Sequence, residues 1–450
     1  MPVFLELLSD FPFTGQIVRV PILQSPNTNI VDTQNINCTV SKCCLQMKRF
    51  LHICSTLNPE SGGPAHVAIQ LSMLHTQMGH QSEILTIDAP ATSHFSDETI
   101  KVINVGPGRF GWSYSRALIP WLTKNLPYYD GVTVHGLWQY PSWATARTIQ
   151  RFRRNRVVCP PLFIRPCGMM DPWFQSWERR PFKTFRNSIY WELFERKALQ
   201  LADRIVYTNQ QECDLAQNTF PRYPKEKDLV IPLGVAEPPS FSESMESEFL
   251  KHCPSVEGKP FILFLSRLDP KKGLDLLIQA YMQVYSHAVK HNPQKLYPRL
   301  VIAGPGKSSA YGMMLQEMAK PMANQITFTG MLTGDAKWGA FYGCDAFILP
   351  SHQENFGLVV AEALACGKKV FLSRQVNIWR EIVEDGVGVA APDTLEGAIQ
   401  LVESAFEYSA SPRKDALDAR KTFDNRFQIA NTARIFVEQF EALSSSSGES

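Results

Sequence analysis

The stretch FILFLSRLDPKKG, residues 261–273, shows the unit from which the fold is built. Its first five residues are apolar and β-prone, which is typical of a buried strand, and a polar turn follows at once. Comparable apolar runs recur through the second half of the chain and alternate with helical patterns; they cover residues 300–303, 326–328, 346–349 and 369–372. This alternation predicts a parallel sheet with crossover helices.

The first half of the chain repeats the alternation. Its apolar runs cover residues 50–54, 83–87, 132–135, 162–164 and 204–207. The chain has 450 residues, about three times the roughly 150 residues of a typical domain. We therefore predict an α/β fold with two doubly wound, Rossmann-like domains that face each other across a cleft.

Changes in composition suggest where the parts of the chain begin and end. Residues 1–46 are rich in Asn, Thr, Gln and Ser without a sustained period, as in a flexible extension or a product of start-codon choice. Residues 237–248 are polar and rich in Pro and Ser, as in a linker. Near the end, Ile429, Ala433, Phe436, Phe440 and Leu443 form one apolar helical stripe that must pack on something. The predicted parts are an extension over 1–46, an N-terminal domain over 47–235, a linker over 236–258, a C-terminal domain over 259–425, a helix over 426–443 that packs back toward the N-terminal domain, and a disordered tail over 444–450.

The composition excludes several classes of protein. A hydrophobic content of 44% with 20% charged residues indicates a globular chain and excludes collagen-like and wholly disordered proteins. Forty-five basic residues against 43 acidic ones are too balanced to require a nucleic-acid partner. The ten cysteines form no C-x-x-C pair, which predicts free thiols in a reducing compartment. Without a long apolar run or a basic N-terminal signal, we expect a cytoplasmic protein, with peripheral contact at the inner face of a membrane as an open option.

The first candidate motif is Ser61-Gly62-Gly63-Pro64, which precedes the helical pattern of residues 65–78. Glycines at a strand-to-helix turn let backbone N–H groups approach an anion, and the N-terminus of the helix adds partial positive charge. The motif therefore suits a phosphate, although a merely tight connection explains it equally well. It does not have the G-x-G-x-x-G spacing of dinucleotide-binding proteins.

The second candidate motif lies in the turn after the strand of residues 261–265. Arg267 and Lys272 are five positions apart at the carboxyl end of this strand, where open α/β sheets bind ligands. An arginine fork and a lysine point charge in this position are able to converge on one dianion. A solvated basic turn is the alternative.

The third candidate motif runs from Glu354 to Glu362. Residues 358–366 are apolar almost all round and predict a buried helix, in which an ionised Glu362 needs a partner. The N–H groups of Phe356, Gly357 and Leu358 open the first turn of that helix. Two acceptor groups around a phosphate cradle suit a sugar nucleotide. In the alternative interpretation, Glu362 binds only neighbouring backbone and Glu354 is solvated.

Taken together, these three stretches resemble glycosyltransferase family 4, a family of retaining enzymes with the GT-B fold. The similarity runs from about Met47 to Phe440, and its most specific element is the pair of glutamates, Glu354 and Glu362, with seven residues between them. The stretches at residues 61–64, 135–138 and 168–173 are similar to bacterial members that build surface polysaccharides. The chain departs from the family pattern at Lys369, where a proline is common, and at residues 377–381.

The resemblance implies a role for each candidate residue. Arg267 and Lys272 would hold the diphosphate of a nucleotide sugar, Glu362 the ribose hydroxyls, and Glu354 the hydroxyls of the transferred sugar. His135, at the end of a strand, would lie beside that sugar, whereas a strand-end histidine taken alone is more often structural. The implied catalytic residues are Glu354, His135, Arg267 and Lys272, and the implied donor-binding residues are Gly62, Gly63, Arg267, Lys272, Met331, Glu354, Asn355, Phe356, Gly357, Leu358 and Glu362.

The predicted mechanism follows from charge. Fixed cations at the leaving diphosphate lower the barrier to its departure. Because no Asp-x-Asp pair occurs, we expect no metal and no other cofactor. We predict a retaining, metal-independent transferase that moves a hexosyl group from a nucleotide-diphosphate sugar to a saccharide or lipid-linked hydroxyl, by front-face attack. A nucleotide-sugar epimerase and a non-catalytic nucleotide-sugar binding module are the alternatives.

A basic region suggests where an acceptor is presented. Five arginines lie within ten residues, and an aromatic and basic tract follows; the residues are Arg147, Arg151, Arg153, Arg154, Arg156, Trp173, Trp177, Arg179, Arg180, Lys183, Phe185, Arg186, Tyr190 and Trp191. Such a region is able to rest on an anionic membrane. A solvated helix face with ordinary core aromatics is the alternative, and no RNA-binding motif is present.

Overall fold

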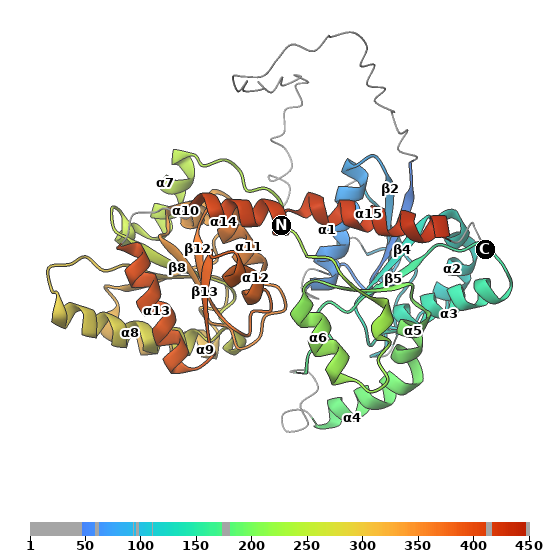
Figure 1. Ribbon diagram of the computed structural model, residues 1–450, viewed down its shortest axis with the longest axis horizontal. Coiled ribbons are helices and arrows are strands. Elements are labelled where there is room, and N and C mark those ends of the chain that lie inside the picture. The colour runs from blue at the N-terminus through green and yellow to red at the C-terminus, as the bar shows by residue number, and fades with distance from the viewer. Residues whose placement is uncertain are drawn as a thin grey trace, which may run out of the picture. The chain divides into compact units, whose positions relative to one another are not determined.

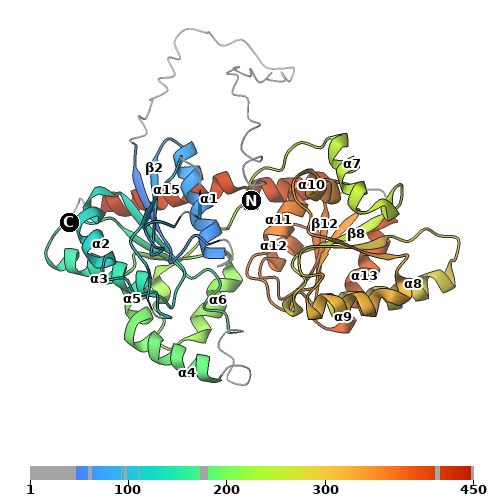
Figure 2. The ribbon, with the colours of Figure 1, turned by 180° about the vertical axis from the view of Figure 1, so that it is seen from behind.

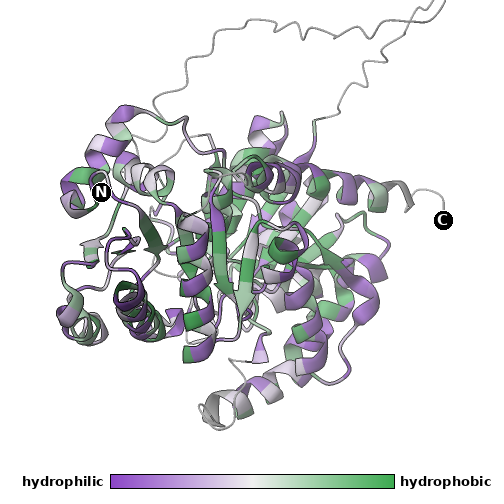
Figure 3. Ribbon diagram, turned by 60° about the vertical axis from the view of Figure 1, so that its left-hand side comes forward, coloured by the Kyte–Doolittle hydropathy of each residue, from purple (hydrophilic) through white to green (hydrophobic). Residues whose placement is uncertain are grey.

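The computed structural model describes residues 47–58, 63–92, 94–95, 99–109, 111–172, 181–410 and 416–446. They form two parallel β-sheets, each accompanied by helices, so the predicted two-domain α/β fold is confirmed (Figure 1). In Figure 3 the strands are mostly hydrophobic, whereas many helices carry both polar and apolar residues. Apolar strands of this kind are typical of parallel sheets that are covered on both faces.

The first sheet has the strand order β3-β2-β1-β4-β5-β6-β7. All its neighbouring strands are parallel: β1 (Arg49–Ile53), β2 (Gln81–Thr86), β3 (Lys101–Asn104), β4 (Gly131–His135), β5 (Leu162–Arg165), β6 (Arg204–Tyr207) and β7 (Asp228–Val230). The helices of this half are α1 (Gly63–Gln77), α2 (Leu118–Asn125), α3 (Tyr140–Arg154), α4 (Pro181–Tyr190), α5 (Arg196–Leu201) and α6 (Gln210–Thr219), with a π-helical turn η5 (Trp191–Glu195) between α4 and α5.

The second sheet has the order β10-β9-β8-β11-β12-β13, again all parallel. Its strands are β8 (Phe261–Leu265), β9 (Arg299–Ala303), β10 (Ile326–Gly330), β11 (Ala346–Leu349), β12 (Lys369–Ser373) and β13 (Gly388–Ala391). The helices that follow in the chain are α7 (Glu243–His252), α8 (Leu274–His291), α9 (Ala310–Ala319), α10 (Gly334–Gly343), α11 (Leu358–Ala365), α12 (Trp379–Glu384), α13 (Leu395–Ser409), α14 (Ala416–Thr422) and α15 (Ile429–Ser446).

The order of the strands reverses once in each sheet. The reversal lies between β1 and β4 in the first sheet and between β8 and β11 in the second. Doubly wound sheets bind ligands outside the carboxyl ends of the strands at such a switch point. Arg267 and Lys272 follow β8, Glu354 follows β11, and His135 ends β4. The fold therefore brings residues from distant parts of the sequence to the two switch points.

The predicted linker over 236–258 is wrong in one respect, because it contains helix α7. This helix packs against α10, where Gly339 allows the two backbones to touch. A Cβ atom at Gly339 would lie 2.0 Å from the carbonyl oxygen of Met245. The Ser- and Glu-rich sequence resembles a linker because only Met245 and Phe249 of α7 are buried.

The final helix, α15, packs on the first sheet and runs beside α1 (Figure 1; Figure 2). The ring of Phe440 stacks on Phe163, with centroids 4.0 Å apart, and lies 5.4 Å from the ring of Phe50. A Cβ atom at Gly131 would lie 2.7 Å from the Phe440 ring, so this site in β4 needs a glycine. The helix continues to Ser446, three residues into the predicted tail, and residues 447–450 lie outside the described chain, as does the predicted extension over 1–46.

Two segments connect the halves, and they lie side by side. Val235 pairs with Gln428 in a parallel bridge, the Val235 N–H donates to the Phe427 carbonyl at 2.8 Å, and the Ile429 N–H donates to the Val235 carbonyl at 3.1 Å. Gly234 permits this approach, because a Cβ atom there would lie 2.3 Å from the Cα atom of Ile429. The two connections therefore form one paired strap instead of two independent linkers.

Candidate active site

The loops after β8 and β11 meet at the switch point of the second sheet. The His352 N–H donates a hydrogen bond of 2.7 Å to the carbonyl of Lys271. Gly273 has φ of +63°, and a Cβ atom at this position would lie only 2.2 Å from the carbonyl oxygen of Pro350. Only glycine tolerates both the conformation and the contact. The two loops are thus held together by backbone at the point where the candidate site begins.

Lys272 and Glu354 form an ion pair across this junction. Their side chains are 13% and 21% exposed, so the pair is largely withdrawn from water. Arg267 lies on the same β8 loop, and its side chain is exposed. The structure therefore joins two of the predicted residues directly and places the second predicted cation on the same loop as Lys272.

The segment from Glu354 to Gly357 is anchored by backbone hydrogen bonds. The Glu354 N–H donates to Gln375 at 2.9 Å, and the Glu354 carbonyl accepts from the N–H of Asn377 at 3.0 Å. Gly357 has φ of +79° and precedes α11. Within the described chain, the N–H groups of Phe356, Gly357 and Leu358 donate no hydrogen bond, as expected for the first turn of a helix. The ring of Phe356 is buried against Phe427, so only its backbone is available to a ligand.

Glu362 has the partner that its burial requires. Its Oε1 accepts a hydrogen bond of 2.7 Å from Nζ of Lys337 in α10, while its buried Oε2 has no partner among the described residues. The Lys337 ammonium also lies over the ring of Trp338, 4.7 Å from the centroid. Sequence reasoning missed Lys337, because a single lysine on a helix carries no signal of its own.

Asn355 reaches residues of the first half. Its carbonyl accepts a hydrogen bond of 2.7 Å from Nδ2 of Asn209, and its own Nδ2 donates to Oγ1 of Thr208 at 3.3 Å. Nδ2 of Asn377 donates to its Oδ1 at 3.4 Å. A Cβ atom at Gly168 would lie 3.0 Å from the Asn355 side chain. Asn355 thus connects the two halves beside Glu354, and its side-chain amide is already hydrogen-bonded.

His135 is buried at the end of β4, with 4% of its surface exposed. Its Nε2 atom lies 2.9 Å from Nδ1 of His52. The turn that follows is held by Glu195, which accepts from the N–H of Trp138 at 2.7 Å and from the hydroxyl of Ser142 at 2.9 Å. Trp138 has φ of +66°, and burial raises the pKa of Glu195 to about 7 against the opposing effect of these hydrogen bonds. No local sequence pattern predicts this support by Glu195.

The remaining predicted donor residues lie at the edges of the site. Gly63 is the exposed first residue of α1, whereas Gly62 lies outside the described residues. Met331 follows β10, is 64% exposed, and lines a depression of about 530 Å³ with Gly304, Gly306 and Lys307. This depression lies at the carboxyl ends of β9 and β10, in the same row of loops as Arg267.

Comparison with known proteins identifies the chain. The model of glycosyl transferases group 1 matches residues 246–417, and that of the glycosyl transferase 4-like domain matches residues 62–234. The two matches together span well over half of the sequence. The chain belongs to glycosyltransferase family 4.

Among relatives of this family 4 glycosyltransferase is the serotype-specific mannosyltransferase WbdA of Escherichia coli, which is 28% identical over 194 residues. The match covers 42% of this chain and 22% of WbdA. The first relatives that the chain matches are covered over 22% to 58% of their own length.

Solved structures confirm the GT-B fold. A glycosyltransferase from Rickettsia africae has a TM-score of 0.67 at 16% identity, with 88% of this chain and 98% of that chain covered. The Anabaena protein HepE in complex with UDP and glucose has a TM-score of 0.63 at 17% identity, with 88% and 100% covered.

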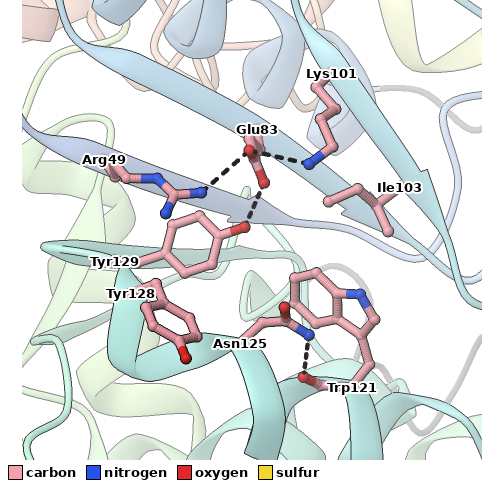
Figure 4. Close-up of a pocket in the computed structure, with 8 residues that line it drawn as sticks. All are labelled: Arg49, Glu83, Lys101, Ile103, Trp121, Asn125, Tyr128 and Tyr129. Carbon is pink, nitrogen blue, oxygen red and sulfur yellow. Dashed lines mark hydrogen bonds and ion pairs between the residues drawn. The ribbon is translucent and has the colours of Figure 1, made fainter.

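The glycosyltransferase also has a pocket at the opposite edge of its first sheet (Figure 4). It measures about 230 Å³ and lies near the starts of β1, β2 and β3. There Glu83 accepts hydrogen bonds from Tyr129, from Arg49 at 3.4 Å and from Lys101 at 3.3 Å. Burial opposes the ionisation of Glu83, but these donors outweigh it and lower its pKa. Because both cations are already paired with Glu83, we interpret this network as structural.

The predicted basic region divides between surface and core. Arg147, Arg151, Arg153, Arg154 and Arg156 are exposed on and just after α3, and Arg153 is paired with Asp203. The indole of Trp191 is fully buried, whereas Phe185 in α4 is 58% exposed. Trp173, Trp177, Arg179 and Arg180 lie outside the described residues, as does the side chain of Lys183.

Two further findings concern metals and membranes. In the described ranges, no group of three or more His, Cys, Asp or Glu side chains is arranged to hold a metal ion. None of the helices described for this glycosyltransferase combines the length and apolar character that crossing a membrane requires.

Proposed function

We propose that the chain transfers a hexosyl group from a nucleotide-diphosphate sugar to a saccharide or lipid-linked hydroxyl, with retention and without a metal. The observation that carries this proposal is the Lys272–Glu354 ion pair at the switch point of the second sheet, close to the motif that contains Glu362. A cation for the diphosphate and a carboxylate for the sugar are thus in contact. The relative named a mannosyltransferase and the neighbour that holds UDP and glucose support a hexosyl donor.

Each residue has a role in this proposal. Lys272 leaves Glu354 and binds the diphosphate, beside Arg267 and the N–H groups at the start of α11. Glu354 is then free to accept hydrogen bonds from hydroxyls of the sugar, and Glu362 accepts from the ribose. Met331 lies along the base, Gly62 and Gly63 bring the first half to the phosphates, and His135 lies near the transferred sugar.

Charge development explains how such a site accelerates transfer. When the bond from the anomeric carbon to the diphosphate oxygen breaks, negative charge grows on the diphosphate and positive charge grows on the sugar. Lys272 and Arg267 stabilise the first of these, and the burial of Lys272 makes its effect stronger than it would be in water. The acceptor hydroxyl attacks from the face that the diphosphate leaves and gives its proton to the departing diphosphate oxygen, so the configuration is retained. We expect activity to survive a chelator; loss of activity that manganese restores would contradict the metal-independent mechanism.

The test begins with the donor. Thermal-shift measurements against UDP, GDP and ADP and their sugars identify the preferred base. Turnover with a matching nucleotide sugar and an acceptor then shows transfer. Without an acceptor, we expect only slow hydrolysis of the donor. An epimerised sugar in the absence of acceptor indicates an epimerase instead. Binding without turnover under all acceptors indicates a binding module.

We propose that the acceptor is presented at an anionic membrane, and one surface of the first half supports this. Phe185, Ile189 and Leu193 are 58%, 47% and 52% exposed and lie four residues apart along α4 and η5. Beside them a groove of about 490 Å³ has Trp143 and Phe194 among its lining residues, with Arg147 and Lys197 alongside. Exposed apolar residues with neighbouring cations match an anionic lipid surface.

Sedimentation with vesicles tests this surface. The chain should bind vesicles that contain phosphatidylserine at low salt and release them at high salt, because the attraction is screened. R147E combined with L193S should weaken binding, whereas K290E at the far end of α8 is the control. Absence of binding at low salt would rule the contact out without affecting the proposed transferase.

A further inference from the structure

Three histidines form a continuous hydrogen-bonded chain beneath α15. Nδ1 of His52 in β1 lies 2.9 Å from Nε2 of His135 in β4, and Nε2 of His52 lies 3.2 Å from Nδ1 of His75 in α1. All three side chains are buried, with 4% exposure or less. At the two ends, Nδ1 of His135 and Nε2 of His75 are buried without a partner among the described residues. The middle ring therefore uses both of its nitrogens, and each outer ring uses one.

The surroundings of the three histidines keep their rings uncharged. Arg165 in β5 pairs in register with His135; it is fully buried, and none of its guanidinium nitrogens has a partner among the described residues. Burial lowers the pKa of all three histidines well below the usual 6.5; Arg165 contributes for His52 and His135, and the other histidines add to the effect. The other titratable groups that act on this cluster are His80, after α1, and Cys167 and Glu212, which act on Arg165.

Because the rings are neutral, the two hydrogen bonds between the three histidines must run in the same direction. A neutral imidazole has one N–H donor and one bare nitrogen acceptor. His52 must therefore donate to one neighbour and accept from the other. If it donates to His135, the proton of His135 lies on Nδ1; if it accepts from His135, that proton lies on Nε2. Either direction allows only one tautomer of His135.

We propose that His52 is a positioning residue, which fixes the tautomer and ring orientation of His135 through its hydrogen bond and is itself oriented by His75. The inference rests on the proposed function, because it gives His135 a place beside the sugar. The hydrogen bond at Nε2 then decides whether Nδ1, on the other side of the ring, carries a proton or a lone pair. A second tautomer would exchange a donor for an acceptor at the same point and would lose the matching hydrogen bond.

Two amide substitutions at one position separate this role from packing. The amide of asparagine reaches about as far as Nδ1 of histidine, and that of glutamine about as far as Nε2. His52→Asn should therefore keep the bond to His135, whereas His52→Gln should keep only the bond to His75. We expect kcat of H52Q to fall roughly tenfold, the effect of about one hydrogen bond, with little change in KM for the donor, and H52N to lose clearly less.

Nitrogen NMR of histidine-labelled full-length chain gives a readout that does not depend on activity. His135 should show one tautomer in the wild type and a mixture in H52Q, while His80→Asn, which alters a nearby histidine outside the hydrogen-bonded row, should leave the wild-type tautomer unchanged. If H52Q does not fold, His75→Phe provides a second test. It removes the hydrogen bond between His52 and residue 75, and it should also give a mixture of His135 tautomers.

Equal kcat values for H52N and H52Q, or a single unchanged tautomer of His135 in H52Q, would overturn the inference. If the wild type shows no transfer with any donor, the proposed function fails instead, and the NMR result still decides whether the histidine chain exists.

Discussion

The side chains of Lys272 and Glu354 neutralise each other where a donor would bind. In the unliganded chain this pair shields two opposite charges that would otherwise be held in a poorly hydrated site. A donor that brings both a diphosphate and hydroxyl groups offers each residue a new partner at the same time. A free nucleotide offers a partner to Lys272 only, so the pair favours the complete donor.

Glu354→Gln tests this exchange of partners. The substitution removes the anion that holds Lys272, so the affinity for nucleoside diphosphate should stay the same or rise, while kcat falls at least tenfold through loss of the contact to the sugar. Calorimetry with the diphosphate and steady-state kinetics measure the two effects. Glu248→Gln, in the exposed pair with Lys251, is the control. Unchanged turnover in E354Q would remove Glu354 from the mechanism.

Lys337→Met tests the support of Glu362. The variant leaves a carboxylate that is only 17% exposed without its cation, so the free energy of unfolding should fall by about 1–3 kcal/mol. Adding Glu362→Gln should recover much of that loss, because no unpaired charge remains. Urea titrations give the values, and K320M at the exposed pair with Glu317 should change stability by less than about 0.5 kcal/mol. A loss in the double variant as large as in K337M would contradict the pairing.

Helix α15 covers part of the hydrophobic face of the first sheet through the ring of Phe440. Its Phe440 ring is stacked between Phe163 and Phe50, and it lies against the bare backbone of Gly131. An aromatic ring held on both sides has little freedom to move away. The glycine and the ring therefore act as one unit, although they are far apart in the sequence.

A mutant cycle measures that unit. Gly131→Ala places a methyl group against the ring and should cost about 1–3 kcal/mol of stability. Phe440→Ala opens a cavity and should cost about 3–5 kcal/mol. In the F440A background the alanine at 131 fills space instead of clashing, so the two losses should not add; denaturant unfolding of all four proteins gives the coupling. Strictly additive losses would show that the cost of the alanine at position 131 does not come from a clash with the Phe440 ring.

The elements that the sequence predicted are those with strong local patterns. The ten predicted strands are present, whereas β3, β7 and β13 were missed because they are short and partly exposed. Helix α7 was interpreted as linker because it buries few residues. The same reason applies to the site: Arg267, Lys272, Glu354 and Glu362 stand in local motifs, but Lys337, Glu195 and the His52–His75 contact depend on tertiary packing that no local pattern encodes.

At the scale of the whole molecule, the buried histidines make stability depend on pH. Their pKa values are lowered in the folded chain, so below pH 6.5 the unfolded chain takes up protons that the folded chain does not, and stability falls as pH falls. Glu195 acts in the opposite sense, because its pKa of about 7 lets the folded chain bind a proton between pH 7 and 4.5.

Between pH 6 and 5 the three buried histidines outweigh the one glutamate, so the free energy of unfolding should fall as the pH falls. Urea unfolding at pH 7, 6 and 5 measures the slope. Glu195→Gln should make the slope steeper, and His52→Asn should make it shallower. A stability that stays level from pH 7 to 5 would contradict the buried, neutral state of the histidines.

The position of α15 has a consequence for synthesis on the ribosome. Residues 429–446 emerge after every strand of both sheets, yet they cover Phe50 and Phe163 near the beginning of the chain. Until α15 has been made, the first sheet exposes a hydrophobic patch around Phe50 and Phe163. Chaperones or unrelated proteins are able to bind this patch. The first sheet is therefore completed only after residues 429–446 have been made, and premature termination before them would disrupt the amino-terminal half as well.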